Sequence, residues 1–267
     1  MPLPLIVIAG QAAWADALAA RLDGCAVQRV TARAGYVARL ADTQPALIVV
    51  DGDADGWRFW ATTPKTSPAT RRIPLIVTAA SGAGRAAALA AGADHALPPD
   101  ELLALGPQLV RDFARLPDPA RQAALDCGCA EPLPPLAREG VAKFNAGAYY
   151  PQHDLFEEQW VNTDGPVRDL YRAILQVGVA YYQIERGNWR GAHKMLLRAV
   201  QWLVILPDVC QGVDVAQLRA DAARVRAELE RLGPAGIARF DRALLRPLRL
   251  VADTSPTAGG SGSVPRA

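Results

Sequence analysis

A histidine and a glutamate four residues apart are the pair in this sequence best suited to chemistry. His153 and Glu157 lie in the segment 149–160, whose pattern predicts a helix, and side chains at i and i+4 share one helical face. An imidazole and a carboxylate at this spacing can supply half of a transition-metal site. They can equally form an acid/base pair acting on a substrate, or a polar cluster with Gln176 that fixes helix register.

An internal repeat places a second histidine, His193, at a position equivalent to His153. Residues 144–149 resemble residues 184–189, and the same offset of 40 aligns His153 with His193. The repeat predicts two helical hairpins of similar build, similar to tetratricopeptide hairpins or formed by ordinary helix packing. In either arrangement His193 would lie on a neighbouring helix, where it could complete a metal site with His153 and Glu157.

Residues around this pair resemble the helical family known as domain of unknown function 309. The resemblance covers about residues 138–206 and rests on Phe144, Asn145, Gly147, His153, Glu157, Trp160, Gln176, Arg186, Gly187, Asn188, Gly191 and Ala192. The family pattern His-x-x-x-Glu-x-x-Trp implies a divalent transition metal on His153 and Glu157, with Trp160, Gln176 and Asn188 in support. Members often carry a further histidine where this chain has Tyr182-Gln183.

Asp51 and Thr78 stand where two predicted strands end. Five short apolar runs alternate with helical patterns, at residues 5–8, 26–30, 46–50, 74–78 and 95–97. This alternation predicts a doubly wound parallel sheet, in which ligands bind at the carboxyl ends of the strands. We therefore expect Asp51 and Thr78 at one edge of an α/β domain.

This half resembles the CheY-like receiver domains of bacterial response regulators. Asp51 falls at the phospho-acceptor position, Thr78 at the switch hydroxyl, and Gly92-Ala93-Asp94 precedes the fifth strand as in the family. The resemblance implies a flavodoxin-like fold over residues 1–115.

The sequence differs from the receiver pattern at the positions that phosphoryl transfer requires. The family's acidic pair after the first strand is replaced by Ala9 and Gly10, or at best Gln11, and its lysine after the fifth strand by Pro98-Pro99. Phosphoryl transfer to a carboxylate needs a hard cation and a positive charge on the phosphoryl oxygens. We therefore expect a pseudo-receiver in which Asp51 is inactive as an acceptor.

Proline-rich segments and a change of pattern divide the chain into two domains. We expect a receiver-like domain (1–115), a proline-rich linker (116–135), a helical domain of the 309 family (136–250) and a disordered tail (251–267). The pattern predicts six helices in the second half, near residues 135–147, 151–162, 166–186, 189–206, 214–232 and 234–246.

Composition narrows the partners and the compartment. The 29 basic and 27 acidic residues are dispersed, so we expect no nucleic-acid partner, and no apolar run near the start is long enough to span a membrane. Arginine outnumbers lysine 26 to 3, a skew that suggests a GC-rich bacterial genome, so isolated arginines are given little weight.

The cysteines and the leading segment indicate a cytoplasmic protein. No secretory signal is evident, and we expect the four cysteines to be reduced thiols. Cys127-Gly128-Cys129 has the spacing to hold a soft metal, but two small residues in an irregular segment explain it as well.

These observations favour a regulatory or scaffolding protein over an enzyme. The receiver-like domain would serve as a docking surface, and the helical domain would bind a protein or a small ligand. The alternative is a metal-dependent helical domain, such as a hydrolase, that uses His153 and Glu157. Oligomeric state is left open by the sequence.

Overall fold

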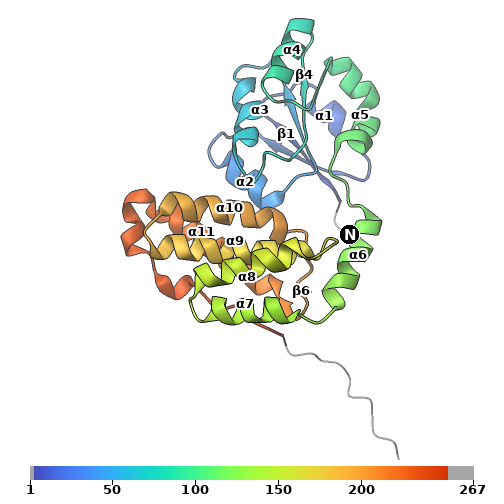
Figure 1. The fold of residues 1–267 in the computed structure, drawn as a ribbon. Coiled ribbons are helices and arrows are strands. Elements are labelled where there is room, and N and C mark those ends of the chain that lie inside the picture. Colours follow the sequence, from blue (N-terminus) through green and yellow to red (C-terminus); the bar gives the residue numbers. More distant parts are fainter. Residues whose placement is uncertain (1–2, 252–267) are drawn as a thin grey trace, which may run out of the picture.

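The N-terminal domain is built on a five-stranded parallel sheet. The computed structural model describes residues 3–251 (Figure 1). The strands are β1 (Leu5–Ala9), β2 (Ala26–Val30), β3 (Leu47–Asp51), β4 (Leu75–Thr78) and β5 (His95–Leu97). Their order in the sheet is β2-β1-β3-β4-β5, with every pair parallel. This is the flavodoxin-like order that response-regulator receivers share, so the predicted fold class is confirmed for this half.

Helices cover both faces of the sheet, which explains why the central strands are continuous apolar runs. They are α1 (Ala15–Ala19), α2 (Tyr36–Thr43), α3 (Trp57–Thr66), α4 (Gly82–Ala90) and α5 (Pro99–Phe113). Alternate residues of β1 point to opposite faces, so that Ile6 and Ile8 pack with α1 and α5 while Val7 packs with α2 and α3.

The C-terminal domain is helical. Its α-helices are α6 (Pro119–Ala130), α7 (Pro135–Asn145), α8 (Tyr149–Val161), α9 (Arg168–Glu185), α10 (Trp189–Leu203) and α11 (Val215–Leu232). Helix α9 packs against both α8 and α10 and is the most deeply buried helix of this domain. The predicted helical character of the second half is confirmed, although this half also contains one short two-stranded hairpin.

The predicted repeat appears as two matching helical hairpins, α7–α8 and α9–α10. Gly147 and Gly187 both adopt a left-handed backbone, with φ of 75° and 68°. Their amides donate to Phe144 and Ile184, which occupy the same position in each turn. A residue with a Cβ is strained at this φ, and glycine is not, so the repeated glycine fixes the turn between the paired helices.

The segment predicted as an irregular linker contains a regular helix, so that expectation is wrong. Asp118 caps α6, because its carboxylate accepts hydrogen bonds from the amides of Ala120 and Arg121 at 2.9 and 3.3 Å. Pro119 then occupies the first helical position, where a missing N–H is tolerated. The cap and proline are a helix start signal, and Cys127-Gly128-Cys129 lies in the last turns of α6.

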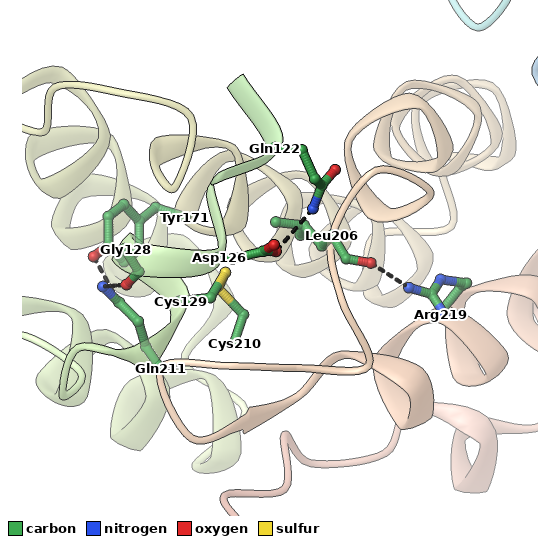
Figure 2. Close-up of a disulfide and its surroundings, with 9 residues drawn as sticks. All are labelled: Gln122, Asp126, Gly128, Cys129, Tyr171, Leu206, Cys210, Gln211 and Arg219. Atoms are coloured by element: carbon green, nitrogen blue, oxygen red, sulfur yellow. Dashed lines mark hydrogen bonds between the residues drawn. A yellow bond between two sulfur atoms is a disulfide. The ribbon is translucent and has the colours of Figure 1, made fainter. Parts of the chain in front are cut away.

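The prediction that all four cysteines are reduced is also wrong. Cys129 and Cys210 form a disulfide that joins α6 to a short hairpin (Figure 2). The hairpin comprises β6 (Val209–Cys210) and β7 (Val213–Asp214). The two cysteines are 81 residues apart in the sequence, so only the folded chain brings them together. Cys25 and Cys127 are free thiols.

Gln211 at the tip of this hairpin makes three hydrogen bonds beside the disulfide (Figure 2). Its amide donates to the Cys129 carbonyl at 2.7 Å and its Nε2 to the Gly128 carbonyl at 3.1 Å. Its Oε1 accepts from the Tyr171 hydroxyl at 2.7 Å. These bonds hold the hairpin against α6 and α9.

The prediction of a last α-helix over residues 234–246 is wrong. Residues 234–246 form two 3-10 segments, Pro234–Arg239 and Arg242–Leu244, in place of one α-helix. Phe240 adopts an extended backbone, and the Asp241 carboxylate accepts from the Ala243 amide, a local bond that competes with helix formation. Except for Val251, the predicted tail lies outside the described residues.

The two domains meet where α2 and the loop after α3 pack on α10 (Figure 1). Ala41, Ala69 and Leu197 form a small buried apolar cluster between them. At its side Arg226 of α11 pairs with Asp42 of α2. Both α2 and the loop 67–72 precede strands, so they lie at the amino edge of the sheet, opposite the edge where Asp51 and Thr78 end their strands.

Candidate functional site

His153 and Glu157 lie on one face of α8, as predicted. The His153 Nδ1 atom is 4.0 Å from Glu157 Oε2 and 3.1 Å from Asp154 Oδ1. The His153 side chain is 30% exposed and that of Glu157 53% exposed, so both are open to solvent. The pair is therefore accessible to a ligand.

An apolar pocket of about 150 Å³ lies beside His153. It is lined by Tyr149, Tyr150, His153, Val179, Tyr182 and Gln183. The family position that often carries a histidine thus faces the same pocket, but here it offers a phenol and an amide. The Gln183 amide oxygen already accepts a hydrogen bond from Asn188 Nδ2 at 2.7 Å.

His193 lies elsewhere, on α10. Its Nε2 is 3.0 Å from Glu230 Oε1 on α11, and its ring stacks on Trp189 with centroids 4.7 Å apart. His153 and His193 line different pockets. Because α9 packs between α8 and α10, the repeat places the two histidines at equivalent positions of separate hairpins without joining them.

The donor set at His153 contains fewer ligands than a structural zinc site. Within residues 3–251 no group of three or more histidine, cysteine, aspartate or glutamate side chains is placed to hold a metal ion. Zinc normally takes three or four protein ligands. The metal reading of His153, Glu157 and His193 stays a prediction.

Asn188, Trp160 and Gln176 fall into two groups. Asn188 caps α10, because its Oδ1 accepts from the Gly191 amide at 3.0 Å. Trp160 turns its ring toward α9, where the Arg172 guanidinium lies 4.8 Å from the ring centroid. Gln176 lines a different pocket from His153, between the domains. Two of the supporting residues therefore belong with arginines and not with the histidine.

Asp51 and Thr78 are directly paired at the carboxyl edge of the sheet. Asp51 Oδ1 accepts from the Asp53 amide at 3.0 Å, and Asp53 in turn accepts from the Ala80 amide at 2.8 Å. Burial raises the pKa of the Asp51 carboxyl, and the nearby Asp53 charge raises it further, although the Asp53 amide acts in the opposite direction. The Thr78 hydroxyl is fully buried and has no hydrogen-bond partner in the part of the chain that the structure describes.

The groups that would assist Asp51 in a receiver are not at their family positions. Ala9 is buried, and Gly10 adopts φ of 85° with the Trp60 ring so close that a Cβ would lie 2.8 Å from it. Pro99 begins α5 directly after β5. Arg85 is in this region, but its guanidinium donates to the backbone carbonyls of residues 79 and 80.

Sequence reasoning missed a cluster of arginines at the opposite edge of the α/β domain. A pocket of about 130 Å³ between the domains is lined by Pro68, Arg71, Arg72, Arg172, Gln176, Arg198, Gln201 and Trp202. A signal existed in the helices, since Arg168 and Arg172 are spaced i, i+4 and so are Arg198 and Trp202. The high arginine content of the whole chain obscured this spacing, because isolated arginines were given little weight.

Comparisons with known proteins support the resemblance stated for the helical half at a coarse level. Residues 137–195 match the model of the domain of unknown function DUF309. An uncharacterized protein of Aquifex aeolicus (strain VF5) is 23% identical over 86 residues, which are 32% of this chain and 26% of that protein. The match thus spans about a quarter of the relative's length.

A solved structure is similar to the α/β domain. It is the crystal structure of a protein classed as a response regulator from Chloroflexus aurantiacus J-10-fl, with 18% identity and a TM-score of 0.33. The match covers 42% of this chain and 99% of that one. The receiver-like fold of this domain rests on its strand order and helix placement. No helix within residues 3–251 is long and apolar enough to cross a membrane.

Proposed function

We propose that this chain is a regulatory or scaffolding protein in which a non-phosphorylated receiver-like domain is held against a helical ligand-binding domain. The observation that carries the proposal is the composition of the carboxyl edge of the sheet. Asp51 is present there, but alanine, glycine and two prolines stand where phosphoryl transfer needs carboxylates and a lysine.

The contact between the domains supports a docking role. It is formed by the amino edge of the sheet, through Ala41 and Ala69 on one side and Leu197 on the other. The ion pair of Asp42 with Arg226 also crosses this boundary. An apolar centre with a charged rim is typical of specific interfaces. The carboxyl edge lies on the opposite side of the sheet, and we propose that it is the surface that receives a protein partner.

Acetyl phosphate labelling tests the proposal. Wild-type protein, freshly desalted, is incubated with magnesium and acetyl phosphate, and intact mass is measured beside Asp51→Ala. We expect no phosphoryl adduct on either protein. An adduct on the wild type that is lost in Asp51→Ala would refute a silent receiver.

A second candidate function follows from the pocket beside His153. We propose, as the alternative, that the accessible pair of His153 and Glu157 would hold a divalent transition metal, which would supply a polarised water for hydrolysis. The support is the 4.0 Å separation of Nδ1 and Oε2 next to a pocket that a small substrate can enter.

Elemental analysis of protein purified without a His-tag decides this second function. This second function requires metal in stoichiometric amount in the wild type and its loss in His153→Ala. His95→Ala serves as the control, because His95 stacks on Phe113 in the other domain. Metal that is substoichiometric and unchanged by His153→Ala would exclude the site.

A further inference from the structure

The pocket between the domains concentrates positive charge. Four guanidinium groups line it, two from the loop after α3 (Arg71 and Arg72) and one each from α9 and α10 (Arg172 and Arg198). No carboxylate is among its lining residues. Within residues 3–251 none of these four arginines has a carboxylate oxygen within ion-pair distance. Asp169, whose charge acts on Arg172, is buried and pairs with Arg121 at 2.8 Å.

Aromatic rings hold two of the arginines in place. The Arg172 guanidinium lies between two indoles, 4.8 Å from the centroid of Trp160 and 4.0 Å from that of Trp202. Arg72 approaches Trp202 from the other domain, at 5.4 Å. Stacked guanidinium groups lose little further side-chain freedom when they bind a ligand. The cluster is thus partly preorganised.

Mutual repulsion makes the empty arrangement unfavourable. Burial lowers the pKa of the Arg172 guanidinium from its usual range, and the charges of Arg72, Arg168 and Arg198 lower it further, while Asp169 acts in the opposite direction. An anion between these groups would replace repulsion by attraction in a partly desolvated site, where both are strong.

Polar atoms without partners line the same place. Gln176 Oε1 and Trp202 Nε1 are buried, and neither has a hydrogen-bond partner among the described residues 3–251. An unsatisfied buried polar atom costs about 1–3 kcal/mol, so native proteins seldom retain one without a reason. A ligand that brings an acceptor for the indole N–H and a donor for the amide oxygen would satisfy both.

We propose that this interdomain pocket binds a small tetrahedral oxyanion of the phosphate class, held by Arg72, Arg172 and Arg198. Guanidinium forks match two oxygens of such an anion, and a hydrogen phosphate presents both acceptor oxygens and an O–H donor. The donor suits Gln176 Oε1 and an acceptor suits Trp202 Nε1. The pocket volume of about 130 Å³ equals roughly four water molecules of about 30 Å³ each, which limits the ligand to one such group.

The bound anion would also join the domains, because its arginines come from both. Arg72 belongs to the α/β domain, and Arg172 and Arg198 to the helical one. The inference rests on the proposed function in assigning a ligand to the helical domain. It does not require Asp51 to be inactive.

Calorimetric titration of the full chain with inorganic phosphate tests the inference. We expect saturable binding, weakened at least tenfold in the double variant Arg172→Gln/Arg198→Gln and less in Arg172→Lys, which keeps the charge but loses the fork. Arg58→Gln is the matched control, since Arg58 stacks on Trp57 at 4.9 Å outside the pocket, and it should bind as the wild type does. Circular dichroism confirms that each variant is folded.

Further arms define the ligand class. Sulfate at equal ionic strength should bind more weakly, because it lacks the O–H donor, and acetate should not compete. Asp51→Ala should bind phosphate normally, which separates this site from any acyl phosphate chemistry. Absence of saturable phosphate binding, or equal affinity in the double variant, would overturn the proposal.

Discussion

The two edges of the parallel sheet differ in what surrounds them. At the carboxyl edge Asp51 and Thr78 lie side by side, and the nearby guanidinium of Arg85 donates to backbone carbonyls. At the amino edge, α2 and the loop after α3 rest on the helical domain and bring Arg72 to face Arg172. Doubly wound sheets usually bind ligands at the carboxyl edge. Here a pocket lined by four arginines lies at the other edge.

This difference shows how a second domain can move the place where a ligand would bind. The carboxyl edge carries Asp51 and Thr78, which match the receiver pattern. It lacks the acidic pair and the lysine that phosphoryl transfer to Asp51 would need. The amino edge carries no family pattern, and its charges gather only because two domains meet there. Three predictions test this contrast.

The largest effect is expected on the helical side, from removing the disulfide. Cys129→Ser/Cys210→Ser should lower the free energy of unfolding by about 2–4 kcal/mol, because the unfolded chain is no longer closed into a long loop. Urea denaturation without reductant measures it. The double variant Cys25→Ser/Cys127→Ser, which touches only free thiols, should behave as the wild type does.

The disulfide prediction also bears on the compartment. Disulfides of this kind are rare in reducing cytoplasm. If reductant leaves the urea midpoint of the wild type unchanged, the bond contributes nothing, and the helical domain owes its stability to packing alone.

An intermediate effect is expected at the amino edge. Ala41 is fully buried against Ala69 and Leu197, so Ala41→Leu overpacks the domain contact and should cost about 1–3 kcal/mol. We expect a larger radius of gyration in X-ray scattering and a lower midpoint of thermal unfolding. Ala86→Leu, on the exposed face of α4, is the control. Unchanged scattering would mean that this contact does not hold the domains together.

The smallest effect is expected at the carboxyl edge, from Asp51→Asn. Burial raises the pKa of Asp51 above its unfolded value, so ionisation of this carboxyl favours the unfolded chain. The asparagine variant should therefore be slightly more stable than the wild type at pH 7. The gain should shrink as the pH falls through the folded pKa and vanish below the unfolded value.

Thermal melts at several pH values check this prediction. Asparagine keeps an oxygen that can accept from the Asp53 amide, so the local turn should survive. Asp55→Asn, which alters an exposed carboxylate in the same loop, provides the control. Destabilisation by Asp51→Asn at pH 7 would show that the Asp51 charge is compensated by a group at this edge.

Much of the fold could be predicted from local pattern. The five apolar runs became five strands, and the helices of the second half began near their capping residues, Asn188 and Asp214. The errors occurred where local signals compete. Proline suggested a linker at 116–135, although Asp118-Pro119 is a helix start. The apolar pattern predicted one helix over 234–246, although Asp241 caps the start of a second, separate 3-10 segment.

The candidate site was likewise predictable where it depends on local geometry and unpredictable where it depends on packing. The spacing of His153 and Glu157 placed both on one helical face, because helix geometry fixes neighbours at i and i+4. The suggested contribution of His193 depended on how two hairpins pack around α9. That packing sends His193 to Glu230, and no local pattern encodes it.

The sequence by itself determined the strands, most helices, the repeated glycine turns and the residues that replace a receiver's acidic pair and lysine. These follow from side-chain period, backbone preference and residue identity, all of which are local. Only the tertiary structure decided that Cys129 meets Cys210. It also decided that four arginines distant in the sequence line one pocket, namely Arg71, Arg72, Arg172 and Arg198. Such contacts depend on how whole elements pack, because packing alone determines which distant side chains share a desolvated space.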